Sequence, residues 1–309
     1  MTKNGKGRSQ LKHRLIEFRE VYIMIIPVIV FFLVFKYYPM YGIVISFKDY
    51  YPSLGISGSP FVGVEHFKTI FIAPQFLRSL RNTLVLSSLK LIFCFPVPIL
   101  MALFLNEMRQ KKVRGTVQTL IYLPNFISWV IIGEIVRILL STGDGLVNNV
   151  ISSLGGEKVP FLTTPEYFYP IYILSTIWKE AGWGSIIYFA SMTGVNPDLY
   201  EAAKLDGAGR LKMVLHVTLP CISPTIIMML IMQIANIMNA GFDPIFNLYN
   251  KSIYSVADIL DTYMYRAGII EGQIEMGAAL GLFKSVINFV MLITADVVIR
   301  KINGRGIYD

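Results

Sequence analysis

The sequence predicts an all-α membrane protein with six transmembrane helices and both termini in the cytoplasm. Of its 309 residues, 54% are hydrophobic and only 16% are charged, and the mean hydropathy is +0.56. This composition is too apolar for a soluble domain of that length. Six apolar runs approach the length of about 20 residues that a helix needs to cross a bilayer. Basic residues gather on alternate connections between these runs.

The six predicted spans leave no room for a separate soluble domain. They cover residues 21–35, 83–105, 117–140, 168–192, 221–238 and 276–299. We therefore divide the chain into a cytoplasmic basic tail, residues 1–20, and one six-helix membrane domain, residues 21–309. The two cysteines, Cys94 and Cys221, fall in or beside spans, and their spacing is typical of neither a metal site nor a disulfide framework.

Lysine and arginine set the predicted orientation. Sixteen of the 28 basic residues fall in the N-terminal tail, the second and fourth connections and the C-terminal end, whereas 7 fall on the opposite connections. Such an excess marks the cytoplasmic side. It is also a sufficient reason for the formal net charge of +8. We therefore expect these charges to lie at lipid headgroups and expect no nucleic acid as a partner.

A short polar segment, EAAKLDGAGRLKMVLHVTLP at residues 201–220, lies on the predicted cytoplasmic side between two long apolar runs. Just before it, Asn196 is a capping acceptor, Pro197 suits the first helical position and Asp198 puts an acid in the first turn. These signals predict a helix over residues 198–205. Gly207 is expected to end it, because glycine adopts the left-handed conformation that terminates helices.

The same segment carries a family resemblance. Glu201, Ala202, Ala203 and Gly207, followed after nine residues by VTLP at 217–220, resemble the EAA motif of bacterial ABC importer permeases, E-A-A-x-x-x-G-x9-I-x-L-P. Val217 in place of isoleucine is the single departure. The similarity covers essentially residues 20–309, and it points to oligosaccharide permeases of the complex-polysaccharide uptake type. It is carried by the segments KYYPMYGIVISFKDY, NEMRQKKVRGTVQTLIYLPNFISWV, IWKEAGWGSIIY and RKINGRGIYD.

The resemblance implies a multi-pass subunit of the MetI-like fold in the bacterial cell membrane, with its core at about residues 80–300 and a coupling helix at 197–208. It implies a second homologous permease, two cytoplasmic ATPase subunits and an extracellular solute-binding protein as partners. The residues expected to contact the ATPase are Glu201, Ala202, Ala203, Asp206 and Gly207. An ordinary solvated loop helix is the alternative interpretation of this segment.

No cofactor site is expected on this chain. It lacks the G-x-x-x-x-G-K-[ST] loop that cradles nucleotide phosphates, so ATP and Mg²⁺ are expected on the partner ATPase. It also lacks H-E-x-x-H and G-x-S-x-G, and its histidines are scattered. We therefore expect a transport subunit without catalytic residues or a metal site.

A path for sugar needs polar groups inside an apolar bundle. Gln233, Asn236, Asn239 and Asp243 recur at helical spacing, which predicts one face of the fifth span. Such a stripe either binds sugar hydroxyls or joins helices by hydrogen bonds, and both interpretations stay open. Further candidates for the substrate path combine aromatic faces with a charge: Trp178, Lys179, Trp183 and Tyr188.

Charged residues inside spans cost about 2.5–3.5 kcal/mol each at the bilayer centre, so they must face protein or water. They are Lys90, Glu134, Arg137, Lys179, Glu180 and Lys284. We expect Glu134 and Arg137 to pair, and Lys90 and Lys284 to reach outward along their spans. Four cations against two acids favour an acidic, uronate-containing oligosaccharide. A secondary carrier and a membrane-embedded lipid-sugar transferase are the alternative functions.

Overall fold

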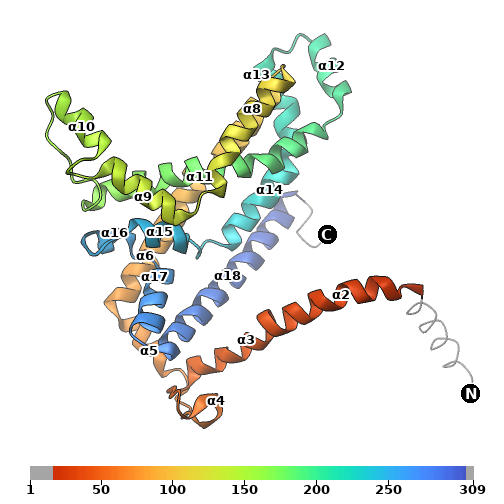
Figure 1. The fold of residues 1–309 in the computed structure, drawn as a ribbon. Coiled ribbons are helices and arrows are strands. Elements are labelled where there is room, and N and C mark those ends of the chain that lie inside the picture. Colours follow the sequence, from red (N-terminus) through yellow and green to blue (C-terminus); the bar gives the residue numbers. More distant parts are fainter. Residues whose placement is uncertain (1–16, 304–309) are drawn as a thin grey trace, which may run out of the picture.

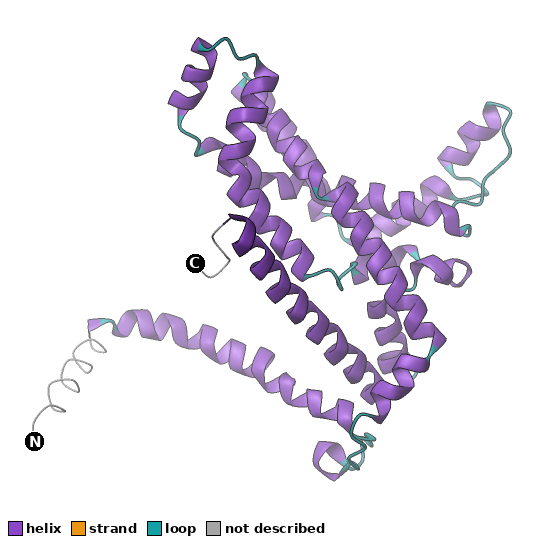
Figure 2. Ribbon diagram, turned by 180° about the vertical axis from the view of Figure 1, so that it is seen from behind, coloured by secondary structure: helices purple, strands orange, loops and turns teal. Residues whose placement is uncertain are grey.

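The computed structural model describes residues 17–303, and these residues form a bundle of helices (Figures 1 and 2). Extended pairing among them is confined to one bridge, between Lys48 and Phe61. The first α-helices are α2 (Arg19–Phe32), α3 (Tyr38–Met40), α4 (Gly55–Gly58), α5 (Glu65–Ile72), α6 (Pro74–Leu89), α7 (Pro96–Glu107), α8 (Lys111–Tyr122), α9 (Trp129–Leu140) and α10 (Leu146–Ser153). They are followed by α11 (Pro165–Thr193), α12 (Pro197–Leu205), α13 (Arg210–Met213), α14 (Leu219–Ala235), α15 (Phe242–Leu248), α16 (Tyr254–Ala257), α17 (Leu260–Tyr265) and α18 (Ile274–Asn303).

Short π and 3-10 segments join many of these helices without a break. They are η1 (Leu33–Tyr37), η2 (Tyr41–Phe47), η3 (Lys90–Cys94), η4 (Leu123–Phe126), η5 (Val214–Thr218), η6 (Lys251–Ile253) and η7 (Arg266–Ile270). Most of the predicted basic tail, residues 1–16, and the end at 304–309 lie outside the described residues. The tail therefore stays a prediction.

Four helical stretches of the described chain are long and apolar enough to cross a membrane. They are Arg19–Phe47, Pro74–Glu107, Arg210–Ala235 and Ile274–Lys301. A fifth is obtained if the bent pair Lys111–Phe126 and Trp129–Leu140 counts as one span. The predicted fourth span, α11, has 29 residues but is not one of them. Its tyrosines, glycines, Lys179 and Glu180 dilute its apolar character.

The third predicted span is not a single straight helix. Its two halves, Lys111–Phe126 and Trp129–Leu140, meet at an angle of 96°. Pro124 lies in the 3-10 turn η4 that ends the first half, where its missing N–H favours a break. The hydroxyl of Ser128 then caps α9 by accepting a hydrogen bond from the Ile131 N–H at 3.4 Å.

Helix α11 is the packing centre of the bundle. Its Phe168 and Tyr172 belong to a buried cluster with Ile245 of α15, and its Tyr188 belongs to a second cluster with Ile222 of α14. A third cluster lies between α6, α17 and α18. Close approach of α8 to α11 depends on Gly182, because a Cβ there would lie 1.9 Å from the Ile121 carbonyl oxygen.

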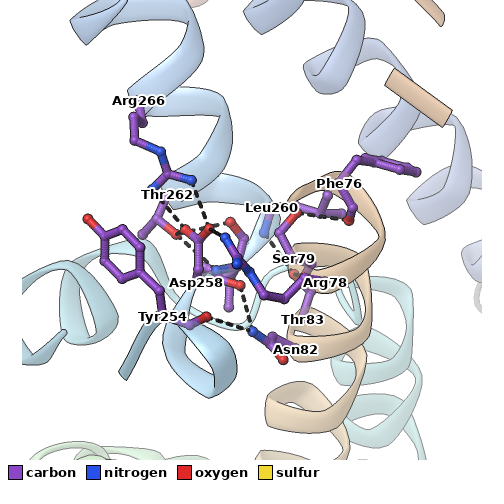
Figure 3. A network of polar contacts seen from close by, with 11 residues as sticks. Phe76, Arg78, Ser79, Asn82, Thr83, Tyr254, Asp258, Leu260, Thr262 and Arg266 are labelled. Atoms are coloured by element: carbon purple, nitrogen blue, oxygen red, sulfur yellow. Dashed lines mark hydrogen bonds and ion pairs between the residues drawn. The ribbon is translucent and has the colours of Figure 1, made fainter. Parts of the chain in front are cut away.

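A buried carboxylate joins the start of α6 to the segment before α17 (Figure 3). Asp258 is fully buried, and its carboxylate accepts hydrogen bonds from Arg266 at 2.7 and 3.1 Å and from Arg78 at 3.4 Å. The Asn82 amide donates to the Asp258 carbonyl at 3.0 Å. The Leu260 N–H donates to the Thr83 hydroxyl at 2.9 Å. Charges this deep are tolerated because they are paired and hydrogen-bonded within the protein.

The helix α2 stands apart from the bundle. It leads away from the other helices in both views (Figures 1 and 2), and each of its residues is exposed. Its side chains are nearly all apolar, with exposures such as 76% for Met24 and 64% for Ile23. Within this chain, α2 therefore has no packing partner among the described residues.

The contact of α8 with α11 yields a prediction for Gly182→Ala. The added methyl group must push the two backbones apart, and such overpacking typically costs about 1–3 kcal/mol. We expect a clearly lower midpoint of thermal unfolding in mild detergent, measured by size-exclusion chromatography after heating. Gly115→Ala on α8 is the matched control, because its Cβ meets no atom within 4 Å. Equal midpoints for the two variants would contradict this account of the interface.

Candidate functional site

The predicted cytoplasmic helix is present with its predicted ends. Helix α12 runs over Pro197–Leu205, and the Asn196 side chain caps it by accepting a hydrogen bond from the Asp198 N–H at 3.0 Å. The helix ends at Gly207, whose φ of +76° lies in the left-handed region. The Ala208 N–H bonds to the Ala203 carbonyl and the Gly207 N–H to the Lys204 carbonyl. These two bonds form the Schellman motif that closes a helix.

Helix α12 lies at one extreme of the molecule, away from the packed core (Figure 1). None of its residues is buried, and Leu205 is 90% exposed. Of the expected contact residues, Glu201, Ala202, Asp206 and Gly207 are exposed and Ala203 is half-buried. The helix thus presents both charged and apolar groups to solvent, as a surface that docks to a protein does.

One hydrogen bond ties this helix to the span that follows it. The Tyr200 and Thr218 hydroxyls lie 3.0 Å apart. Thr218 is buried at the junction of η5 with α14, and Pro220 stands at the second position of α14. The residue before Glu201 and a residue within VTLP therefore meet across the turn, which holds the two halves of the motif segment together.

A central cavity of about 180 Å³ lies between η3, α7, α11 and α14. Its wall includes Lys90, Thr176, Glu180, Tyr188 and Gln233. A smaller hollow adjoins it and shares Lys90 and Gln233. The Lys90 ammonium lies 3.1 Å from the Glu180 carboxylate. The cavity therefore combines one aromatic wall, several hydrogen-bonding groups and an ion pair.

Three members of the predicted polar stripe come together, although not on one helix. Gln233, Asn236 and Asn239 all line the smaller hollow. The expectation of a continuous helical face is wrong, because α14 ends at Ala235 and Gly241, with φ of +107°, separates it from α15. Asp243 lies in the first turn of α15, is exposed and lines neither hollow.

The candidates on α11 separate into different environments. Tyr188 is 3% exposed and lines the central cavity. Trp178 and Trp183 are about half exposed on the outer surface and line neither hollow. Trp183 instead packs edge-on against Phe126, with ring centroids 5.6 Å apart.

Lys179 stabilises the bend of the third span through hydrogen bonds to its backbone. The residue is 8% exposed, and its ammonium donates to the carbonyl of Asn125 at 2.8 Å and to that of Ile127. It also lies 5.8 Å from the Trp129 ring centroid. These carbonyls end a helix, where a cation is favoured. Lys179 lines neither hollow, and its contacts within this chain position the bend of the third span.

The remaining charges within spans pair with acids. Arg137 pairs with Glu134 at 2.9 Å, as expected. Lys284 does not reach outward as predicted but pairs with Asp261, and Lys90 turns inward to Glu180. The excess of cations counted in the sequence is therefore mostly neutralised within the protein. Sequence reasoning missed Lys90 as a cavity residue, since its acid partner is far away in the chain.

A family model described as "Binding-protein-dependent transport system inner membrane component" matches residues 95–304. The chain belongs to this family. It is a multi-pass permease subunit of an ABC importer in the bacterial cell membrane, as the sequence predicts.

Curated relatives extend this likeness over almost the whole chain. The "Polygalacturonan/rhamnogalacturonan transport system permease protein YteP" of Bacillus subtilis (strain 168) is 48% identical, over 97% of this chain and 94% of its own length. "Protein LplB" of the same organism is 42% identical, over 98% of this chain and 95% of its own length.

A solved structure shares the fold closely. It is described as "Crystal structure of a bacterial ABC transporter involved in the import of the acidic polysaccharide alginate". The similar chain has a TM-score of 0.88 and 43% identity, covering 95% of this chain and 99% of its own length. At this identity the secondary-carrier and transferase alternatives lose their support.

The contacts of Lys179 yield a second prediction. Lys179→Met leaves two half-buried carbonyls without this donor, and a hydrogen bond from a charged group typically contributes about 1.5–3 kcal/mol. We expect a lower unfolding midpoint in detergent, partly restored in Lys179→Arg. Trp178→Phe is the neighbouring control, because its side chain lies on the outer surface. A Met variant as stable as the wild type would show that the bend does not need this cation.

Proposed function

We propose that the chain forms half of a translocation path for acidic, uronate-containing oligosaccharides. The observation that carries the proposal is its likeness, at 48% and 43% identity, to a polygalacturonan/rhamnogalacturonan permease and to a chain of an importer for the acidic polysaccharide alginate. The central cavity supports it with hydroxyl-binding groups, an aromatic wall at Tyr188 and a cation at Lys90.

The proposed topology has six spans with both termini in the cytoplasm. The bent pair Lys111–Phe126 and Trp129–Leu140 is the third span, and α11 is the fourth. α11 crosses despite its polar residues, because the bundle rather than lipid surrounds Lys179 and Glu180. The basic excess on the N-terminal tail, the second and fourth connections and the C-terminal end supports this orientation.

In the proposed assembly, α12 inserts into a groove of a cytoplasmic ATPase. Glu201 offers a carboxylate for a charge-assisted contact, and Gly207 lets the partner approach closely. ATP and Mg²⁺ act on that ATPase, of which two copies drive the importer. An extracellular solute-binding protein delivers the oligosaccharide, and alternating access moves it inward.

A second homologous permease completes the path and covers α2. An apolar helix exposed on all sides of its own chain needs lipid or another protein around it. α2 leads away from the bundle instead of lying on it (Figure 1), which suits a helix that reaches across to a neighbouring subunit.

The coupling proposal is tested by mass spectrometry of proteins that co-purify with the tagged chain in mild detergent. We expect an ABC ATPase and a second permease with the wild type, and loss of the ATPase alone from Glu201→Arg/Gly207→Trp. Glu157→Arg, on an exposed outer loop, is the control and keeps both partners. A double variant that retains the ATPase excludes α12 as its main contact. If no second permease co-purifies with the wild type, the proposal that such a subunit packs against α2 is contradicted.

The substrate proposal is tested by uptake in a strain that lacks its own chain and carries this one with its partner subunits. We expect uptake of trigalacturonate to exceed uptake of a neutral oligosaccharide of equal length by tenfold or more, about 1.4 kcal/mol of discrimination. Equal uptake of the two would remove the acidic preference. Uptake of neither would exclude this substrate class.

A further inference from the structure

Lys90 occupies an unusual place among the ion pairs of the described residues. It lines both the central cavity and the adjoining hollow, and its partner Glu180 lines the central cavity as well. Neither Arg266–Asp258 nor Lys284–Asp261 has both members in the wall of a described hollow. Lys90–Glu180 is thus an ion pair set in the surface of the path.

The two members of this pair differ in exposure. The Lys90 side chain is 19% exposed, whereas that of Glu180 is 39% exposed. The acids that pair with Arg266 and Lys284 are only 0% and 10% exposed. Glu180 therefore leaves its partner at a smaller cost, because its carboxylate already faces open space rather than packed protein. Lys90, in contrast, needs an anion wherever Glu180 goes.

The surroundings of Lys90 suit a hydroxylated anion. The Ser87 hydroxyl is one turn before Lys90, lines the same hollow and is buried without a hydrogen-bond partner. Gln233, Asn236 and Asn239 line this hollow too. A buried hydroxyl without a partner costs free energy unless something supplies one. This hollow measures only about 10 Å³, so the sugar ring itself would lie in the adjoining central cavity of about 180 Å³ and direct a hydroxyl toward Ser87 past the shared residues Lys90 and Gln233.

We propose that Lys90 is the carboxylate-binding residue of the path, and that a uronate carboxylate of the cargo takes the place of Glu180 on its ammonium. This inference rests on the proposed function. The exchange replaces one carboxylate by another, so the lysine is never left unpaired in the membrane. Released Glu180, whose side chain is already 39% exposed, turns away from the cargo carboxylate and is solvated by water of the open cavity. A neutral oligosaccharide cannot make this exchange and meets a closed ion pair.

Native Cys94 reports on the exchange, because it lines the same cavity as Lys90 and Glu180. Cys221 is exposed and is replaced by serine in every variant, so that a thiol reagent labels Cys94 alone among the cysteines of this chain. Partner-subunit thiols are resolved by separating the subunits before detection. The purified whole importer, without its binding protein, is titrated with trigalacturonate or with its fully methyl-esterified form. The measured quantity is the concentration that halves the labelling rate.

We expect trigalacturonate, but not its methyl ester, to protect Cys94. In Lys90→Gln/Glu180→Gln, which removes both charges together, the half-protecting concentration should rise by about tenfold or more, since a charge-assisted hydrogen bond is lost. The single variant Lys90→Arg, which keeps the cation, should keep the half-protecting concentration near that of the wild type. Glu134→Gln is the control, because this acid belongs to an exposed pair on α9 away from the cavity. Co-purification of the partner subunits in a single size-exclusion peak serves as the check that each variant folds and assembles.

Three results would overturn the proposal. One is equal protection by trigalacturonate and its methyl ester; another is unchanged protection in the double variant; a third is a Cys94 that the reagent never labels, since the cavity would then be closed to water. If the wild type imports trigalacturonate and the double variant is still protected, only this inference fails. If the wild type imports no acidic oligomer, the proposed function fails with it.

Discussion

The structure depends on one constraint: a charged group that enters the membrane must find its partner inside the protein. α11 meets this constraint twice in succession. Lys179 turns to the carbonyls that end the first half of the third span, and Glu180, the next residue, turns to Lys90 on η3. Because neighbouring helical residues point about 100° apart, one side chain fixes the bend while the other faces the cavity.

This arrangement explains why the bundle is centred on a long helix that carries two adjacent charges, Lys179 and Glu180. A purely apolar α11 would be compatible with the lipid around it. It could, however, neither stabilise the 96° bend of the third span nor place a carboxylate in a cavity. The same constraint applies to the buried carboxylate of Asp258, which pairs with two arginines, one from α6 and one from η7. Polar contacts thus fix the relative positions of helices that dispersion alone would hold less specifically.

Local signals allowed α12 to be predicted residue by residue. Its cap, its first proline and its closing glycine all act within a few residues, so Asn196 and Gly207 appear in the structure with the roles that the sequence assigns to them. Apolar length likewise predicted α18 and the span that begins at α6. The break after Ala235 had a signal that the spacing argument overrode, namely the turn-forming residues Asn239 to Gly241.

Pairings across the chain had no such signal. Arg78 meets Asp258 from 180 positions away, and Lys90 meets Glu180 from α11. A single sequence shows that such charges must be paired but not with whom. That is why the sequence predicted an outward-reaching Lys90, whereas packing turns Lys90 inward to Glu180. The contact of Lys179 with the Asn125 carbonyl had no signal in the sequence either.

Helix α12 and the cavity are joined through one continuous helical stretch. Tyr200 of α12 holds Thr218, and the span Arg210–Ala235 carries on from there to Gln233 at the cavity wall. A helix of these 26 residues is roughly 39 Å long. A tilt imposed at the end next to α12 therefore moves Gln233 relative to α11 and η3, on which Glu180 and Lys90 stand. In the proposed assembly, motion driven by ATP at α12 would change the cavity wall that Gln233 shares with the ion pair. Access and cargo binding would then be two results of one movement.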